Sequence, residues 1–275
     1  MWKGFKETIK QSWTARLVLV LFVALSLWWV TIYLRGLTSG FENNAFTLSY
    51  PWLSLIGGII GLGIAKKWGG FKSIIGRSLL ALSLGLLAQS FGQAAYAYYI
   101  YVTGIEVPYP SVGDVGYFSS ILFYLYGVLL LARVLRVNFS LRSLANQAQA
   151  ILIPLIVLGF SYFLFLRGYE FDWSQPLKIF LDFGYPLGQA IYVSIAMIAL
   201  LASRKALGGF MKEPMSFLLV ALVVQYFSDF MFLYQVSNEQ WYVGGTNDFT
   251  YLLAYSFMAL ALIQLGTTLQ KIDKS

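Results

Sequence analysis

Carboxylate and carboxamide side chains stand inside long apolar segments, and these are the residues that could do chemistry. Asp229 follows Gln225 by four residues, and Gln93 follows Gln89 by the same spacing. Side chains four residues apart lie on one face of a helix. An aspartate at the centre of a membrane helix costs about 2.5–3.5 kcal/mol on insertion scales. We therefore expect Asp229 to face the protein interior or a wet cavity.

A third polar group follows near the outer end of another apolar segment, where Tyr185 and Gln189 come about one and two turns after Asp182. Together these side chains predict a ligand-binding pocket in the outer half of a helical bundle. Hydrogen bonds that only fix helix packing would explain the same residues, and the sequence leaves both interpretations open. The predicted ligand-binding residues are Gln89, Gln93, Asp182, Tyr185, Gln189, Gln225 and Asp229.

The composition excludes several kinds of chemistry, because the chain has no Cys and no His. Thiol nucleophiles, disulfides and histidine-based metal sites or acid–base catalysis are absent. We expect no cofactor and no metal site. Asp114 and Asp229 are the only conceivable carboxylate pair for an aspartyl enzyme. The interpretation of Asp114 as a helix cap argues against that pair, so we do not expect an enzyme.

The elements that would position these residues are long apolar segments. The chain is 59% hydrophobic and 11% charged, which is typical of a polytopic membrane protein. Each segment is long enough, or nearly so, to cross a hydrocarbon core of roughly 30 Å. The sequence predicts an all-α integral membrane fold with eight transmembrane helices, at 16–36, 49–66, 75–102, 114–136, 148–166, 177–202, 215–235 and 249–270.

Basic residues alternate between the loops. All of the 19 Lys and Arg residues except Arg35, Arg167 and Lys178 lie at the termini or in every second loop. Such residues stay on the cytoplasmic side, which predicts cytoplasmic termini and a multi-pass protein of the cell membrane. The formal charge of +7 is spread over several short segments. Lipid headgroups explain it better than nucleic acid does.

A short motif recurs about every 67 residues, always where a segment enters from the outer side. It reads D-x-x-Y in three copies, and Thr replaces Asp in the first; the copies are 47–50, 114–117, 182–185 and 248–251. The spacing predicts four parallel helical hairpins, with the second and fourth most alike. The single domain, 1–275, would hold an amphipathic interfacial helix at 1–15 and hairpins at 16–66, 75–136, 148–202 and 215–270.

Some of these polar residues have a structural explanation at the starts of helices. Asp and Thr are preferred capping residues, and a carboxylate is favoured at the positive end of a helix. Ser111 and Asp114 have the spacing of a capping box, with Asp in place of the usual Glu. We therefore predict capping roles for Thr47, Ser111, Asp114 and Asp248.

The segment Pro108–Tyr117 contains Pro108, Pro110, Ser111, Asp114 and Tyr117 in the order P-x-P-S-x-x-D-x-x-Y. It resembles the P-x-P-S-x-A-D-x-x-Y pattern of bacterial multi-helix membrane-sensor regions that precede diguanylate cyclase or phosphodiesterase domains. About ten residues carry the resemblance, and Gly113 replaces the usual Ala. The resemblance implies a sensory input module. Because no output domain follows, any signal would pass to a separate protein.

Three functions therefore stay open. The first is a sensory or ligand-binding module with an outward-facing polar pocket, which signals through a separate cytoplasmic partner. The second is a small-solute transporter or channel built from two parallel halves. The third is a structural subunit of a membrane complex. In each case the lipid bilayer is a partner, and a homo-oligomer is compatible with the sequence.

Overall fold

The computed structural model describes residues 2–105, 107–134, 144–206 and 212–272. These residues form helices and contain no strand. The elements are α1 Trp2–Gln11, α2 Trp13–Leu34, α3 Phe41–Ser49, α4 Trp52–Lys67, η1 Gly70–Lys72, α5 Ile74–Ala97, η2 Tyr98–Thr103, α6 Val112–Val134, α7 Leu144–Ser161, η3 Tyr162–Leu166, α8 Pro176–Ala206, α9 Lys212–Ser237 and α10 Thr246–Ile272. Both η2 and η3 are π-helical turns that end a helix, and η1 is a 3₁₀ turn.

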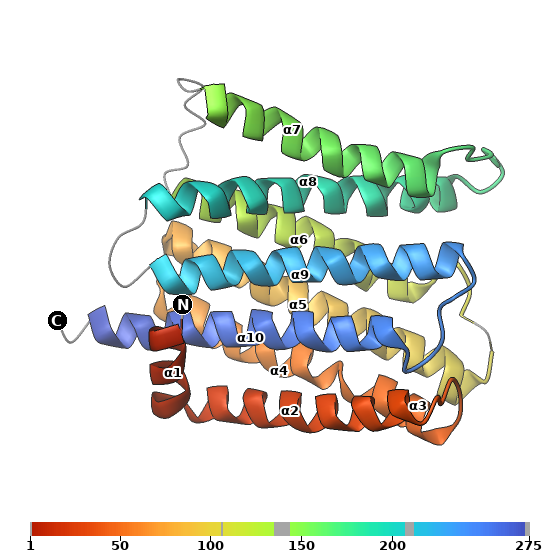
Figure 1. Ribbon diagram of the computed structural model, residues 1–275, viewed down its shortest axis with the longest axis horizontal. Helices are drawn as coiled ribbons and strands as arrows, with labels where there is room; N and C mark the ends of the chain where they lie inside the picture. The colour runs from red at the N-terminus through yellow and green to blue at the C-terminus, as the bar shows by residue number, and fades with distance from the viewer. Residues whose placement is uncertain (1, 106, 135–143, 207–211, 273–275) are drawn as a thin grey trace.

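Seven helices of the described residues are long and apolar enough to cross a membrane, which makes this a multi-pass membrane protein. The eighth expected segment, 148–166, corresponds to a shorter apolar helix, Ile151–Leu166. This segment contains Pro154 and changes from α to π geometry after Ser161. Figure 1 shows α7 lying at the edge of the bundle, beside α8.

The second segment differs from the predicted range of 49–66. It begins with α3 at Phe41, at the end of the bundle opposite to the start of α1, and continues as α4 to Lys67 (Figure 1). The two helices meet at Tyr50 and Pro51. Proline has no backbone N–H to donate, so a helix commonly breaks at this residue. The break places Tyr50 and Thr47 against the bundle interior, where both are buried.

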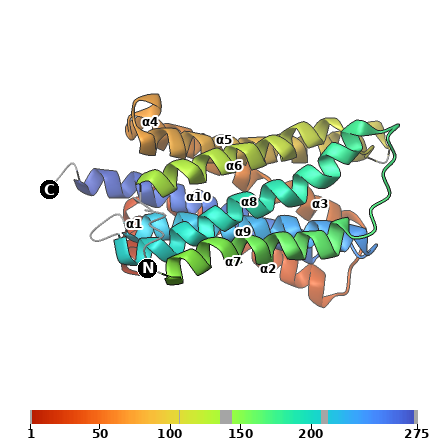
Figure 2. The same ribbon diagram turned by 90° about the horizontal axis from the view of Figure 1, so that it is seen from above.

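Six helices pack in a closed ring. Each of α4, α5, α6, α8, α9 and α10 contacts the next, and α10 contacts α4 again. Helix α2 packs against α10, and α7 packs against α8. Figure 2 shows α4, α5 and α6 on one side of the bundle and α2, α7 and α9 on the other. In α10, 78% of the apolar stretch is buried, so this helix forms much of the core.

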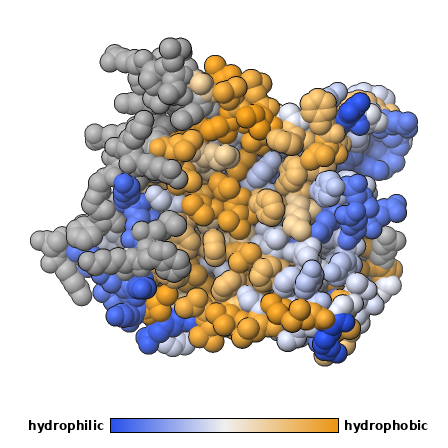
Figure 3. Space-filling view, viewed as in Figure 1, coloured by the Kyte–Doolittle hydropathy of each residue, from blue (hydrophilic) through white to orange (hydrophobic). Residues whose placement is uncertain are grey.

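The two ends of the bundle differ from its middle. The start of α1 and the end of α10 lie at one end, together with the end of α6 and the start of α9 (Figure 1). Figure 3 shows an apolar band across the middle of the visible face, with hydrophilic residues gathered towards both ends. This distribution is expected when the hydrocarbon core of a bilayer surrounds the middle of the molecule.

The short N-terminal helix packs against the bundle. Thr8 of α1 is buried and lies 3.0 Å from the hydroxyl of Thr267 in α10. The Glu213 carboxylate of α9 accepts hydrogen bonds from the backbone N–H groups of Gly4 (3.2 Å) and Phe5 (3.0 Å). A carboxylate at this position is favoured by the positive end of α1. Helix α1 is therefore tied to the ends of α9 and α10.

Small residues let α4 approach its neighbours closely. A Cβ atom added to Gly57 would lie 2.7 Å from Ala259 Cβ of α10. A Cβ added to Gly61 would lie 2.2 Å from the Ser83 hydroxyl of α5. These glycines form one closely packed seam on α4, whereas Gly63 on the same helix has no atom within 4 Å of such a Cβ.

We predict that Gly57→Leu destabilises the bundle by about 1–3 kcal/mol, because the added side chain forces α4 away from α10. Thermal unfolding in lipid nanodiscs measures the loss. The matched control is Gly63→Leu on the same helix, which should melt close to the unmodified protein. Equal melting of both variants would contradict the packing described for this seam.

Candidate functional site

The Asp229 carboxyl group is buried between three helices, with 5% of the residue exposed. Its Oδ1 atom accepts hydrogen bonds from Gln225 Nε2 and from the Tyr251 hydroxyl of α10, both at 3.0 Å. The Tyr192 hydroxyl of α8 donates to Oδ2 at 3.4 Å. A polar group buried without such donors would cost several kcal/mol, so these contacts hold the carboxyl group in place.

A second cluster continues from this one around Gln89 of α5. The Tyr255 hydroxyl of α10 donates to Gln89 Oε1 at 3.1 Å. Gln89 Nε2 donates to the Ser120 hydroxyl of α6 at 2.8 Å. The rings of Tyr251 and Tyr255 stack with their centroids 5.7 Å apart, which joins the two clusters. Polar contacts thus link α5, α6, α8, α9 and α10 inside the ring.

Asp248 forms a third buried centre, at the start of α10. Its Oδ2 atom accepts hydrogen bonds from the Thr47 hydroxyl (2.6 Å) and the Gly244 N–H (2.8 Å), and the Tyr50 hydroxyl lies 3.3 Å from Oδ1. Asp248 therefore closes the turn before α10, as a capping residue does. Thr47 does not cap a helix start, because it lies near the end of α3 and donates to Asp248.

Asp114 has the contacts of the predicted capping box. Its Oδ2 atom accepts hydrogen bonds from the Ser111 N–H at 2.7 Å and the Ser111 hydroxyl at 3.1 Å. The Gly113 N–H donates to the Ser111 hydroxyl oxygen at 3.2 Å. The Tyr185 hydroxyl of α8 donates to Asp114 Oδ1 at 2.7 Å. Asp114 thus stabilises the first turn of α6 and also joins this helix to α8.

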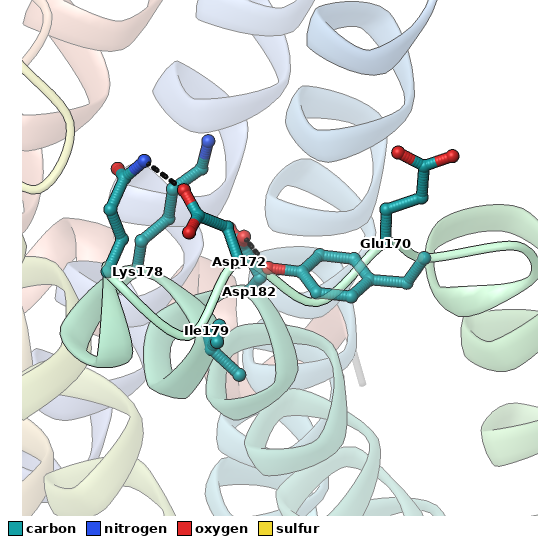
Figure 4. Close-up of a pocket in the computed structure, with 7 residues that line it drawn as sticks. Glu170, Asp172, Lys178, Ile179 and Asp182 are labelled. Carbon is teal, nitrogen blue, oxygen red and sulfur yellow. Dashed lines mark hydrogen bonds between the residues drawn. The ribbon is translucent and has the colours of Figure 1, made fainter.

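Asp182 lies near the start of α8, at the end of the bundle opposite to the start of α1, in a small pocket of about 190 Å³ that we call the outer pocket. The hydroxyls of Tyr109 (2.7 Å) and Tyr169 (2.6 Å) both donate to its carboxylate. Figure 4 shows Asp182 and Asp172 pointing into the same pocket. The full lining is Tyr169, Glu170, Asp172, Gln175, Lys178, Ile179 and Asp182.

The electrostatics of this outer pocket follow from its hydrogen bonds. The bond to Asp182 raises the pKa of Tyr169 to about 12. Burial, with a further contribution from the Asp182 hydrogen bond, raises the pKa of Tyr109. Hydrogen bonds from Ser174 and Gln175 lower the pKa of Asp172. The two phenols near Asp182 therefore stay protonated as donors across the physiological pH range.

The seven residues predicted to bind a ligand lie in several places and not in one pocket. Gln225 and Asp229 are in direct contact, and Gln89 belongs to the neighbouring cluster. Gln189 is buried on α8. Tyr185 binds Asp114, and Asp182 lies in the outer pocket. Gln93 lines a separate groove beside α4. The sequence of one segment shows which residues share a face of a helix, but it does not show which other helix that face contacts. The prediction of one pocket therefore grouped residues that the fold separates.

Sequence reasoning missed Tyr192, which donates to Asp229. Its position was a usable signal, because Tyr192 follows Tyr185 by seven residues and lies on the same face of α8. Eight buried side-chain atoms of the described residues have no hydrogen-bond partner, and two of them lie at this cluster: the Tyr124 hydroxyl and Gln225 Oε1. Such atoms are rare in proteins and call for an explanation.

The chain was compared with protein-family models, curated proteins and solved structures, and none of them matches.

We predict that Tyr169 titrates near pH 12, well above the usual value of about 10. A raised pKa in the folded protein means that this hydrogen bond contributes stability below about pH 10 and loses it as the pH rises towards 12. The phenolate absorbance difference between the unmodified protein and Tyr169→Phe measures this titration. In the Asp182→Asn variant, the midpoint of this absorbance change should move towards pH 10. A step already centred near 10 in the unmodified protein would contradict the contact.

Proposed function

We propose that the protein is a sensory or ligand-binding module of the cell membrane, which passes a signal to a separate cytoplasmic protein. The observation that carries the proposal is the Asp229 cluster. An ionisable side chain at this depth is costly and is commonly functional. The neighbouring Gln225 Oε1 and Tyr124 hydroxyl have hydrogen-bonding capacity that no described protein group uses. A ligand bound beside the carboxyl group would use this capacity.

The topology fits the proposal. The start of α1 and the end of α10 lie at one end of the bundle, and we assign that end to the cytoplasm because most basic residues of the sequence fall at the termini or in the loops expected there. We also propose that α7 crosses the membrane as an eighth span and that the four hairpins are repeats. The order of packing supports the repeats, because the contacts α4–α5, α5–α6 and α6–α8 have counterparts in α8–α9, α9–α10 and α10–α4.

Helix α9 gives the signal a physical route. Asp229 lies towards its outer end, and Glu213, which binds the N-terminus of α1, lies at the opposite end. The two positions are about 24 Å apart along a helix that rises about 1.5 Å per residue. A shift or rotation of α9 that begins at Asp229 would therefore change how α1 is held. Helix α1 and the neighbouring end of α10 are the surface that we propose a partner reads.

The interior favours a sensor over a transporter. Between the Asp229 cluster and Glu213, most of the buried side chains on α9 and the neighbouring parts of α5 and α10 are apolar. A polar solute on a path through the ring would lose its hydration there without gaining hydrogen bonds. These apolar side chains include Leu82, Leu86, Leu218, Leu222, Met258 and Leu262. The resemblance of the Pro108–Tyr117 segment to membrane-sensor regions points the same way.

The proposal predicts that Asp229→Asn alters the position of α1. The asparagine keeps the shape of the side chain but replaces one acceptor oxygen by a donor, which disturbs the contacts with Tyr192 or Tyr251. Because the chain has no Cys, spin labels can be attached to Lys10→Cys on α1 and Lys66→Cys on α4. Electron–electron distance measurements in nanodiscs should show a shift of about 1–2 Å or a broader distribution.

Glu239→Gln is the matched control, because it makes the same chemical change at an exposed outer position. It should leave the distances unchanged. If Asp229→Asn does not fold, Tyr192→Phe disturbs the same carboxyl group more mildly, because it removes the longest of its contacts. A folded variant whose distance distribution superimposes on that of the unmodified protein would rule out coupling through α9.

A further inference from the structure

A second cavity lies between α4 and α5, near their outer ends. It is a groove of about 610 Å³, which is within the usual range of about 300–1,000 Å³ for small-molecule sites. Its walls come from α3 and α4 on one side and from α5 and the π-turn η2 on the other. The lining residues are Thr47, Leu48, Pro51, Trp52, Leu55, Ser90, Gln93, Ala94, Ala97, Tyr98, Tyr101 and Val102.

The groove opens to the side of the bundle, where lipid surrounds the protein. Trp52 and Val102 at its edges are 61% and 70% exposed, and Tyr98 is also exposed. Gln93 is about ten residues, or roughly 15 Å, from the outer end of the π-turn. This depth is within the hydrocarbon core of the outer leaflet. A molecule in the groove would therefore arrive from the bilayer and not directly from water.

The lining has hydrogen-bonding groups but no charge. None of the residues that line the groove is Asp, Glu, Lys or Arg. Gln93, Ser90 and Thr47 provide an amide and two hydroxyls among apolar and aromatic walls. The outer pocket at Asp182 is different, since Glu170, Asp172 and Lys178 line it. A charged ligand would gain no opposite charge in the α4–α5 groove and would lose its hydration.

We infer that the groove binds an uncharged, lipid-soluble ligand that carries a hydrogen-bonding oxygen and enters from the outer leaflet. This inference rests on the proposed function, for which it supplies the class of ligand. The apolar walls take the hydrocarbon part of the ligand, and Gln93, Ser90 and Thr47 meet its oxygen.

The groove also touches the buried carboxyl centres. Thr47 lines the groove and donates its hydroxyl proton to Asp248 at 2.6 Å. Gln93 is one helical turn from Gln89, which binds Tyr255 and Ser120. A ligand oxygen that competes for Thr47 or displaces Gln93 would therefore alter the contacts inside the ring. This position lets a ligand in the bilayer act on the helices that reach the other side.

Photolabelling of the full chain tests the inference. The protein is placed in phosphatidylcholine nanodiscs with a diazirine-bearing monoacylglycerol as the uncharged probe, and unlabelled monoacylglycerol is the competitor. We expect saturable labelling of residues 47–55 and 90–102. Ala97→Trp fills the groove and should abolish saturable labelling. Ala24→Trp is the matched control on exposed α2 and should not reduce it.

Gln93→Leu removes a hydrogen-bonding group without emptying the groove and should weaken labelling about tenfold, the effect of one lost hydrogen bond of about 1.4 kcal/mol. It also tests the inference if Ala97→Trp does not fold. Two results would overturn the inference: labelling that does not saturate, and equal labelling by a diazirine-bearing phosphatidylglycerol probe. Either result would mean that the probe reports only the lipid that surrounds the protein.

The two proposals fail separately. If labelling does not saturate but Asp229→Asn shifts the spin-label distance as predicted, the groove proposal is wrong and the sensory function stands. If labelling saturates but Asp229→Asn causes no distance shift, the groove stands as a binding site and the proposed coupling between Asp229 and α1 is wrong.

Discussion

Buried carboxyl groups in this protein have to be matched with hydrogen-bond donors, because the surrounding hydrocarbon supplies none. Tyrosine hydroxyls provide half of the donors to Asp229 and Asp248. Asp229 accepts hydrogen bonds from the hydroxyls of Tyr251 and Tyr192, and Asp248 accepts one from the hydroxyl of Tyr50. A tyrosine suits this role because its ring fills apolar space while its hydroxyl donates a hydrogen bond. The closed ring of six helices follows from this need, since the donors come from neighbouring helices.

The repeated D-x-x-Y motif is a source of these contacts. Its tyrosine comes about one turn after its aspartate, so both side chains lie on the same side of a helix. In two of the four copies, the tyrosine donates to the aspartate of another copy. Tyr185 of the third copy binds Asp114 of the second, and Tyr50 of the first binds Asp248 of the fourth. A short local motif thereby fixes contacts between distant parts of the chain.

Much of the fold could be predicted from the sequence, because it depends on local patterns. Hydrophobic length located seven of the spans, and the spacing of Ser111 and Asp114 predicted the contacts that begin α6. The break at Pro51 and the earlier start of α3 were not predicted. Asn43 and Asn44 make α3 too polar to extend the apolar run, so hydrophobic length alone placed the start of this segment at residue 49.

The site could be predicted only in part. Asp229 stood out, since it is a carboxylate inside an apolar run, and its neighbour Gln225 was found from helical spacing. The partners from other helices were not visible, because Tyr251 and Tyr192 are separated from Asp229 by 22 and 37 residues. The lateral groove was not visible either, since it results from how α4 and α5 pack.

These contacts give a consistent functional picture. One half of the ring carries polar centres, buried apolar side chains follow, and the Glu213 carboxylate holds α1 at the other end. An event at these centres has two continuous elements, α9 and α10, through which to reach α1. A rigid helix with a polar contact at each end is a simple way to connect two sides of a membrane. All of this depends on the hydrogen bonds to Asp229.

A double-mutant cycle between Asp229→Leu and Tyr251→Phe tests that dependence most directly. Unfolding of the two single variants and the double variant in nanodiscs gives the coupling free energy of the pair. The contact at 3.0 Å predicts a coupling of about 1–3 kcal/mol, as expected for a buried hydrogen bond to a carboxyl group. Additive effects, with a coupling below about 0.3 kcal/mol, would show that Tyr251 does not support Asp229 and would contradict the account.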